Sequence, residues 1–334
     1  MAVWQATLVQ NLLKESGVSS EPVYIKSEGD IDTVTPLYAL GVQGIFTKTL
    51  DAALLSNRID IAVHSMKDVP TQLAKGIQQA AVLKRASYKD IFVAHPKAPF
   101  RLPPVGEATN AHPSLKLDEG IILHTYLSKL SGSDGPSHRE GLGMGQIVVA
   151  TSSIRRRAQW LNRYPNHTIE NLRGNVNTRL RKLTESNWSG AIFAAAGLER
   201  INLRPEKSID LDWMLPAPAQ GAIMIVCREE DKIALESCKF FNDEHTALCT
   251  KIERDFLHTL MGGCSTPISA LAKIKNSTVE FEGNICTPDG SIKTAIKKEL
   301  PLENASTAGV RLANELLAQP SASKIVQDIC YAKK

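Results

Sequence analysis

Short strand-like runs alternate with amphipathic segments in the middle of the chain, and polar residues follow each run directly. Three runs predict strands of one sheet: Ile147–Ala150, Thr168–Leu172 and Ala191–Ala195. Helical spacing follows the first two runs, and Thr151-Ser152-Ser153 predicts the cap of the first helix. Strands that alternate with helices in this way are typical of a parallel α/β sheet.

The chain before residue 87 shows the same order of elements. The pattern predicts an amphipathic helix over Ala2–Ser16, a strand over Pro22–Lys26, a helix over Phe46–Asn57 and a strand of the buried parallel type over Ile59–Val63. Polar residues from His64 to Asp68 follow that last strand. We therefore expect a first α/β domain that carries polar side chains at the end of this strand.

Residues from about 97 to 146 depart from this pattern. Pro, Gly, Ser and His are frequent there, and Ser131–Ser137 is close to a flexible linker in composition. Because so long an irregular stretch is uncommon inside a compact domain, we predict an insertion into a second α/β domain.

The last third of the chain predicts a small α+β domain. Its expected elements are a strand at Ala222–Val226, helices at Lys232–Phe240, Asn242–Met261 (capped by Asn242) and Ser306–Gln319, and strands at Ile268–Ile274, Thr278–Cys286 and Ser291–Ile296. The last two strands are expected to form a hairpin across Pro288-Asp289-Gly290.

Composition narrows the class of protein. Hydrophobic residues make up 43% and charged residues 22%, as in ordinary globular proteins, and a net charge of +4 argues against a general nucleic-acid-coating surface. No apolar run reaches the roughly 20 residues that span a bilayer. The six cysteines form no C-x-x-C pair, so we expect free thiols, no metal site and a cytoplasmic location.

Arginines recur just beyond the predicted strands. Because the carboxyl ends of parallel strands share one edge, Arg155, Arg156, Arg173, Arg179 and Arg200 are expected to gather there. Helix N-termini and guanidinium forks both bind anions, so this edge predicts a ligand with several carboxylates or phosphates. Nucleic-acid phosphates would also suit the cluster, but no aromatic stacking platform accompanies it. We assign Arg157, Arg163, Arg181 and Arg204 to solvated helix faces instead.

Two further residues have a chemical and a structural interpretation. Asp68, beside Lys67 and before Pro70, can stabilise positive charge in a reaction or can be a solvated loop acid. Cys264 follows two glycines, which can expose its thiol as a nucleophile or attachment point, and spacing alone does not choose between that role and none. His64 is assigned a structural role, and the other five cysteines are assigned to the interior.

Six motifs occur in an order that covers nearly the whole chain outside the insertion. They are Val63–Pro70 (VHSMKDVP), Thr151–Arg156 (TSSIRR), Leu172–Val176 (LRGNV), Ala196–Arg200 (AGLER), Gln220–Ala222 (QGA) and Gly262–Pro267 (GGCSTP). Each motif alone is weak, but the ordered set resembles the porphobilinogen deaminase family, also called hydroxymethylbilane synthases.

The resemblance implies a three-domain fold and a reaction. Two α/β domains resemble periplasmic binding proteins, and a small C-terminal α+β domain follows. The implied boundaries are residues 1–87 with 220–239, residues 88–219, and residues 240–334. The implied transferase condenses four porphobilinogen molecules head to tail, with loss of ammonia, into hydroxymethylbilane on a covalently bound dipyrromethane cofactor. It is expected to act as a monomer without nucleic-acid or membrane partners.

Residue roles also follow from the resemblance. It implies that Asp68 is catalytic and that Cys264 carries the dipyrromethane through a thioether. The residues implied to contact the cofactor are Lys67, Ser65, Thr151, Ser153, Arg155, Arg156, Arg173 and Gly174. Those implied to contact the substrate are Arg179, Arg200, Phe46 and Gln220.

The chain also differs from the family pattern. Family members carry a strand and an Arg-x-Ser motif before the first helix, whereas this sequence starts inside that helix, and Gln43 stands where the family has a lysine. A catalytically impaired truncated homologue is therefore one alternative. A non-catalytic anion-binding protein of the periplasmic type is another, and a nucleic-acid binder is a third.

Overall fold

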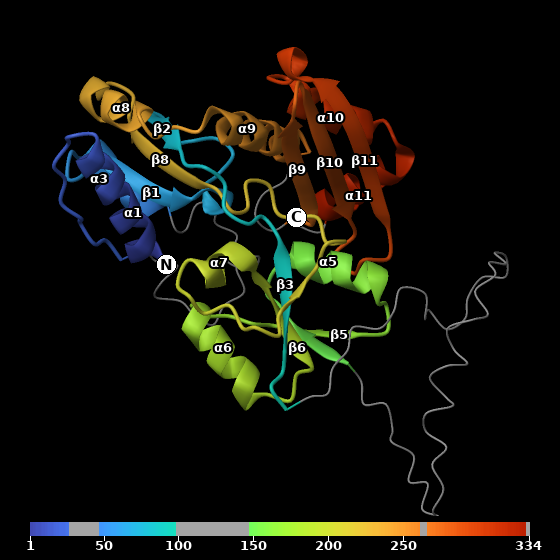
Figure 1. Cartoon of the computed structure of the whole chain (residues 1–334). Coiled ribbons are helices and arrows are strands. Elements are labelled where there is room, and N and C mark those ends of the chain that lie inside the picture. Colours follow the sequence, from blue (N-terminus) through green and yellow to red (C-terminus); the bar gives the residue numbers. More distant parts are fainter. Residues whose placement is uncertain (27–46, 98–146, 261–265, 332–334) are drawn as a thin grey trace, which may run out of the picture. The chain divides into compact units, whose positions relative to one another are not determined.

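The computed structural model describes residues 1–26, 47–97, 147–260 and 266–331. The described residues form three sheets (Figure 1). The class expected from the sequence, two α/β parts and a smaller α+β part, is confirmed. The predicted insertion lies almost wholly outside the described residues.

The first sheet has the strand order β1-β8-β2, with β1 at Ile61–Ser65, β8 at Ile223–Arg228 and β2 at Ile77–Val82. Both neighbours run antiparallel to β8. The prediction that β1 has a parallel partner is therefore wrong among the described residues. The apolar run that suggested it is explained by helices on both faces of the sheet, which bury either strand direction equally.

Side chains that alternate along β8 enter two different cores. Ile223 and Ile225 pack with Val9 of α1 (Ala2–Glu15) and with α8 (Lys232–Lys239), whereas Met224 packs with Leu54 of α3 (Lys48–Leu55). This period of two is what a strand covered on both faces requires. The predicted strand at 22–26 is wrong, because Val23 and Tyr24 are 58% and 69% exposed and have no buried face to pair along.

The second sheet has the order β5-β4-β6-β3-β7. Its strands are β5 (Thr168–Glu170), β4 (Val148–Ala150), β6 (Gly190–Ala194), β3 (Asp90–Ala94) and β7 (Ile209–Asp210). β4 is parallel to β5 and β6, as predicted, and β3 is antiparallel to β6. The strand endings after β4, β5 and β6 therefore share one edge, which is the premise of the arginine prediction.

Helices cover both faces of the second sheet. α6 (Val176–Glu185) and α7 (Ala195–Glu199) lie over the core that contains Ile91 and Phe193. On the opposite face, Trp160 of α5 (Ile154–Arg163) stacks on Phe92, with 5.5 Å between the ring centroids. Ser153 caps α5 as predicted, because its hydroxyl accepts the Arg156 backbone N–H.

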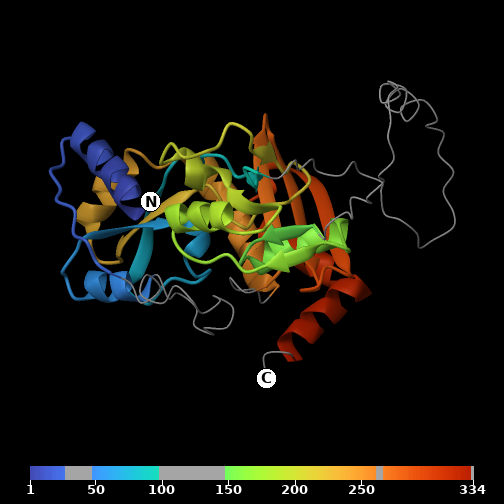
Figure 2. The same cartoon turned by 90° about the horizontal axis from the view of Figure 1, so that it is seen from below.

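The third sheet is the antiparallel meander β11-β10-β9, with β9 at Ile268–Lys275, β10 at Thr278–Cys286 and β11 at Lys293–Pro301. α9 (Glu244–Thr259) and α10 (Ala308–Leu317) pack on it around Phe256 and Phe281. α11 (Pro320–Tyr331), the red helix near the C-terminus in Figure 2, was not predicted. No helix in the described part of the chain is long and apolar enough to cross a membrane.

One predicted cap is wrong by a single residue. Asp243, not Asn242, accepts the Thr246 backbone N–H at the start of α9. The Asn242 side chain instead accepts the Val82 backbone N–H at the end of β2. A long-range contact therefore takes the residue that local sequence favoured for the cap.

Two segments cross between the first and second sheets and lie side by side. Residues 83–89 lead from β2 to β3, and residues 211–222 lead from β7 back to β8. The Ala86 backbone N–H donates to Gly221 O, and the Arg85 guanidinium donates to Gln220 O at 2.8 Å. Gly221 has φ +91°, and a Cβ there would lie 2.7 Å from the Ser87 carbonyl oxygen, so only glycine fits this crossing. The crossing brings Gln220 close to the arginine-bearing edge of the second sheet.

Candidate functional site

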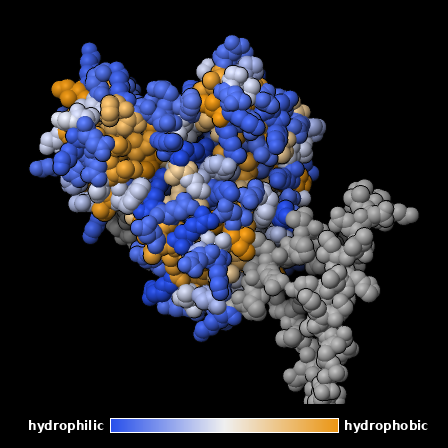
Figure 3. All heavy atoms as spheres, viewed as in Figure 1, coloured by the Kyte–Doolittle hydropathy of each residue, from blue (hydrophilic) through white to orange (hydrophobic). Residues whose placement is uncertain are grey.

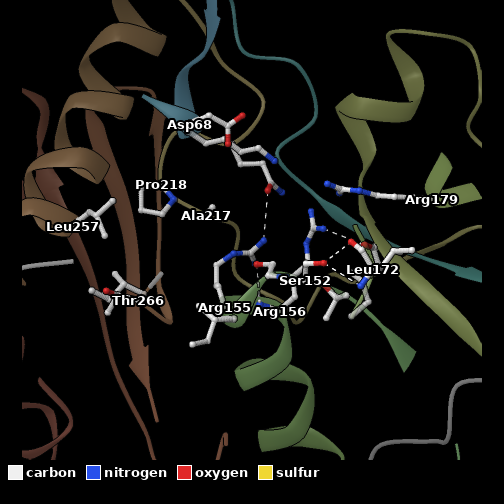
Figure 4. A pocket seen from close by; sticks show the side chains of 17 residues that line it. Asp68, Ser152, Arg155, Arg156, Leu172, Arg179, Ala217, Pro218, Leu257 and Thr266 are labelled. Carbon is white, nitrogen blue, oxygen red and sulfur yellow. Dashed lines mark hydrogen bonds between the residues drawn. The ribbon is translucent and has the colours of Figure 1, made fainter. Parts of the chain in front are cut away.

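A pocket of about 190 Å³ is lined by residues from all three sheet regions. Figure 4 shows Arg155 and Arg156 rising into it from α5, Arg179 pointing in from α6, and Asp68 on the opposite side. The lining residues are Lys67, Asp68, Thr151, Ser152, Ser153, Ile154, Arg155, Arg156, Leu172, Arg179, Ile192, Ala217, Pro218, Gln220, Leu257, Thr266 and Ile268.

The two arginines on α5 share one buried carboxylate. Asp90, which opens β3 and is fully buried, lies 2.7 Å from Arg155 Nη1 and 2.8 Å from Arg156 Nη2. Burial raises the pKa of Asp90, but the two guanidiniums outweigh it and bring that pKa down to about 2. Asp90 is therefore ionised at neutral pH, and the three groups together carry one net positive charge.

Gln220 completes this cluster from the crossing segment. Its side-chain amide donates to Asp90 Oδ1 at 2.9 Å and to Tyr88 O at 2.7 Å. Arg155 donates to Leu215 O at 2.8 Å, while its Nε is buried without a hydrogen-bond partner. A buried guanidinium with an unsatisfied N–H is suited to an anionic ligand that reaches it.

Arg179 lies on α6 and contacts the turn that follows β5. Ser152, in the turn after β4, exchanges hydrogen bonds with the backbone N–H and C=O of Leu172, which holds the two turns together. Gly174 has φ +111°, and its carbonyl accepts from Arg179 Nε at 2.7 Å. Burial and the nearby Arg156 and Arg173 lower the pKa of Arg179 to about 10, so it remains a cation at neutral pH.

Asp68 and Lys67 lie on the short 3₁₀ turn Met66–Asp68 that follows β1. Arg254 of α9, itself buried, holds this turn by donating to Val69 O at 3.0 Å and to Pro70 O at 2.5 Å. Asp68 is exposed, whereas burial lowers the pKa of Lys67 to about 8. The turn thus presents an acid and a weakly basic amine to the same pocket.

The structure brings together eight of the residues expected at the site. These are Asp68, Lys67, Thr151, Ser153, Arg155, Arg156, Arg179 and Gln220. Four expected residues lie outside the pocket lining: Ser65, Arg173, Gly174 and Arg200. The two others, Cys264 and Phe46, lie outside the described residues.

The four residues outside the lining have other neighbours. Ser65 accepts a hydrogen bond from Gln5 of α1 at 2.9 Å, and Gly174 accepts from Arg179. Arg200 donates to Gly221 O at 2.7 Å and lies 5.7 Å from the Trp4 ring centroid. Arg173 is buried in the turn before α6. None of these four residues contributes to the pocket lining.

The structure confirms the predictions for the buried cysteines that it describes, but only some of the predictions for solvated arginines. Cys227, Cys238, Cys249 and Cys286 are free and buried, as predicted, and burial raises the pKa of each. Arg157 and Arg181 are exposed, but Arg204 forms ion pairs with Glu199 and Asp210. Arg163 lies over the Trp213 ring at 4.8 Å. These two arginines are therefore partnered rather than freely solvated.

Sequence reasoning missed the residues that hold the site together, above all Asp90 and Arg254. Asp90 precedes an apolar run like many surface acids, and Arg254 lies within a charged stretch of a helix. Their partners are distant in the sequence, so no local spacing indicates either role.

Family models match most of the chain. "Porphobilinogen deaminase, dipyromethane cofactor binding domain" matches residues 1–112 and 128–236, and "Porphobilinogen deaminase, C-terminal domain" matches residues 247–318. This chain belongs to the porphobilinogen deaminase family. The pocket takes its lining from both matched regions of the family, with Leu257, Thr266 and Ile268 supplied by the second.

Curated relatives named porphobilinogen deaminase match 84–98% of this chain. Porphobilinogen deaminase of Campylobacter hominis is 34% identical over 96% of this chain and 92% of its own. That of Acidithiobacillus ferrooxidans is 35% identical over 98% and 95%. The chloroplastic enzyme of Oryza sativa is 38% identical over 84% of this chain and 67% of its own.

A solved substrate-binding protein of an amino acid ABC transporter covers 71% of this chain and 79% of its own, at 12% identity and a TM-score of 0.31. At that score it carries no weight beside the family match.

Proposed function

We propose that this protein condenses four porphobilinogen molecules head to tail, with loss of ammonia, into the linear tetrapyrrole hydroxymethylbilane. The observation that carries the proposal is the pocket itself, where Asp68 faces the cations Arg155, Arg156 and Arg179. Each substrate molecule carries two carboxylates and a pyrrole N–H. The arginines match the carboxylates, and the acid matches the N–H.

Asp68 has the position needed to assist the chemical step. As ammonia leaves, positive charge develops on the substrate pyrrole, and a fixed carboxylate nearby stabilises that charge while accepting the pyrrole N–H. Arg179 and Lys67 lie close enough to Asp68 for its negative charge to raise their pKa values, against the lowering that burial causes. Both cations line the same pocket as Asp68, where they can bind the carboxylates of the substrate.

Cys264 is the proposed attachment point of the dipyrromethane cofactor, through a thioether. It lies in the short segment between the end of α9 and the start of β9. Leu257 on one side of that segment and Thr266 and Ile268 on the other all line the pocket, which supports the assignment. When bound, the dipyrromethane supplies the free pyrrole position to which the first substrate is joined. Arg155 and Arg156 would bind its carboxylates.

The test is the intact mass of the purified protein. We expect a mass excess of two linked pyrrole units and a pink colour with acidic Ehrlich's reagent. Cys264→Ala should lose both, whereas Cys286→Ala, which changes a buried thiol elsewhere in the third sheet, should keep both. An unmodified parent mass would reject the cofactor assignment, and an unmodified mass together with tight binding of carboxylates would favour a non-catalytic anion-binding protein.

Asp68→Asn separates loading from turnover. We expect this variant to carry the cofactor and to lose most of its turnover, because the amide has no charge to offer the developing cation. Near-parental turnover in a fully loaded Asp68→Asn protein would remove Asp68 from the chemical step.

We also propose a cytoplasmic monomer with no nucleic-acid or membrane partner. The four free thiols that lie buried in the described part of the chain suit a reducing compartment. Hydrophilic residues cover most of the face that Figure 3 shows, and hydrophobic residues gather at a few places on it. The proposed domains are residues 1–87 with 220–239, residues 88–219, and residues 240–334. Each of these contains one of the three sheets, which supports the division.

A further inference from the structure

We propose that Asp90 is a positioning residue, which orients the guanidiniums of Arg155 and Arg156 toward the ligand carboxylates. This inference rests on the proposed function, because it assumes that these arginines bind the carboxylates of cofactor and substrate. Asp90 itself does not line the pocket and is fully buried beneath the two arginines.

The geometry fixes each guanidinium from behind. Asp90 Oδ1 accepts from Arg156 Nε at 3.0 Å and lies 2.8 Å from Arg156 Nη2, so one oxygen holds two nitrogens of the same fork. Arg156 Nη1 donates to Ile192 O at 3.1 Å. Because a guanidinium has five N–H groups in a rigid plane, these contacts fix its orientation and still leave N–H groups for a ligand.

Arg155 is held by the other carboxylate oxygen. Its Nη1 lies 2.7 Å from Asp90 Oδ2 and 2.8 Å from Leu215 O, while its Nε has no hydrogen-bond partner. The Nε is therefore a donor that the protein leaves unused. One carboxylate thus sets the directions of two arginines that follow each other in the sequence and would otherwise repel.

Asp90 is in turn fixed by the backbone and by Gln220. It opens β3, which pairs with β6 and β7 on its two sides, and Gln220 donates to Asp90 Oδ1. A carboxylate on a central strand moves less than one on a loop, which suits a group that orients others. Gln220, which lines the pocket, also connects this anchor to the crossing between the sheets.

The alternative is that Asp90 only neutralises buried charge. Removal of one member of a buried ion cluster destabilises a fold whatever its role, so loss of stability does not distinguish the two interpretations. Glu253 provides a matched control. It is also fully buried and ion-paired, at 2.6 Å from Arg85, but it lies outside the pocket lining.

The experiment compares Asp90→Asn with Glu253→Gln, using full-length protein whose loaded fraction is known from intact mass. Initial rates are measured against porphobilinogen concentration and expressed per loaded molecule. We expect Asp90→Asn to raise KM about tenfold with kcat changed much less, as when an interaction with bound ligand is weakened. Both variants should lower the midpoint of thermal unfolding by a similar amount, but Glu253→Gln should leave KM unchanged.

Two further variants keep the proposal falsifiable. Asp90→Glu retains the charge but moves it by one methylene, so it should fold more readily than Asp90→Asn and still raise KM. In an Arg155→Gln background, Asp90→Asn should raise KM by a clearly smaller factor, because one of its two partners is already gone.

The positioning role would be overturned by an unchanged KM in both Asp90 variants. It would also be overturned if Asp90→Asn raised KM by the same factor in the parental and the Arg155→Gln backgrounds. Failure of the proposed function itself would look different, since the parent protein would then carry no dipyrromethane.

Discussion

Arg254→Met tests whether α9 holds the turn that carries Asp68. The arginine donates to two backbone carbonyls of this turn, Val69 O at 3.0 Å and Pro70 O at 2.5 Å, and more weakly to Met66 O at 3.4 Å. Methionine keeps much of the length of the side chain but offers no donor. The substitution therefore removes the contacts and leaves the packing volume largely filled.

The size of the effect follows from these contacts. A hydrogen bond to a charged group contributes about 1.5–3 kcal/mol, so loss of the two shorter bonds costs about 3–5 kcal/mol if water cannot replace them. Part of the turn is exposed, so water will replace some of the lost hydrogen bonds. We therefore expect the free energy of unfolding to decrease by about 3 kcal/mol. Some of that loss should appear as misplacement of Asp68, and turnover should fall by about a hundredfold.

The assay measures urea unfolding and kcat on the same loaded preparation. Arg228→Met is the control, because Arg228 also donates to two carbonyls, Leu54 O at 3.1 Å and Ile59 O at 2.7 Å, and it lies outside the pocket lining. It should lose comparable stability and keep its kcat. The reasoning is refuted if Arg254→Met keeps parental kcat, or if both variants lose kcat in the same proportion as stability.

Two pH predictions follow from buried bases. Because burial lowers the pKa of Lys67 to about 8, its positive charge is lost as pH rises through that value, and kcat/KM for porphobilinogen should fall above about pH 8. In Lys67→Arg, kcat/KM should stay constant above that pH. A parallel fall of kcat/KM in the parent and the variant would exclude Lys67 as the cause. Burial also lowers the pKa of His64 from 6.5 to about 4, so its neutral form favours the fold above pH 6.5. About 3 kcal/mol should be lost as pH falls from 6.5 to 4. His64→Gln should reduce the difference in unfolding free energy between pH 7 and pH 4.5, and an unchanged difference would contradict the assignment.

Local signals were sufficient for much of the second sheet. The Ser153 cap, the parallel strands β4, β5 and β6, and the gathering of Arg155, Arg156 and Arg179 at one edge all follow from short-range patterns. Each depends on residues a few positions apart, where helix capping and strand periodicity act. These are the parts of the site that a single sequence can predict.

Features that depend on distant partners could not be predicted in this way. The direction of β1 depends on β8, more than 150 positions later, and an apolar run reads the same in either direction. Asp90 and Arg254 acquire their roles only through contacts with residues 60 or more positions away. The same limit applies to Arg200, which bonds across the crossing at Gly221 instead of lining the pocket.

The pocket carries positive charge that the protein itself compensates only in part. Burial and mutual repulsion lower the pKa of Arg155 and Arg179, and burial lowers that of Lys67, so the cationic forms are held at an electrostatic cost. Asp90 offsets part of this cost for the two arginines on α5 but lies too deep to meet a ligand. Under the proposed function, carboxylates that enter from the pocket side would supply the remaining counter-charge. A neutral ligand would leave these cations uncompensated, so we expect the same arrangement to select against uncharged competitors.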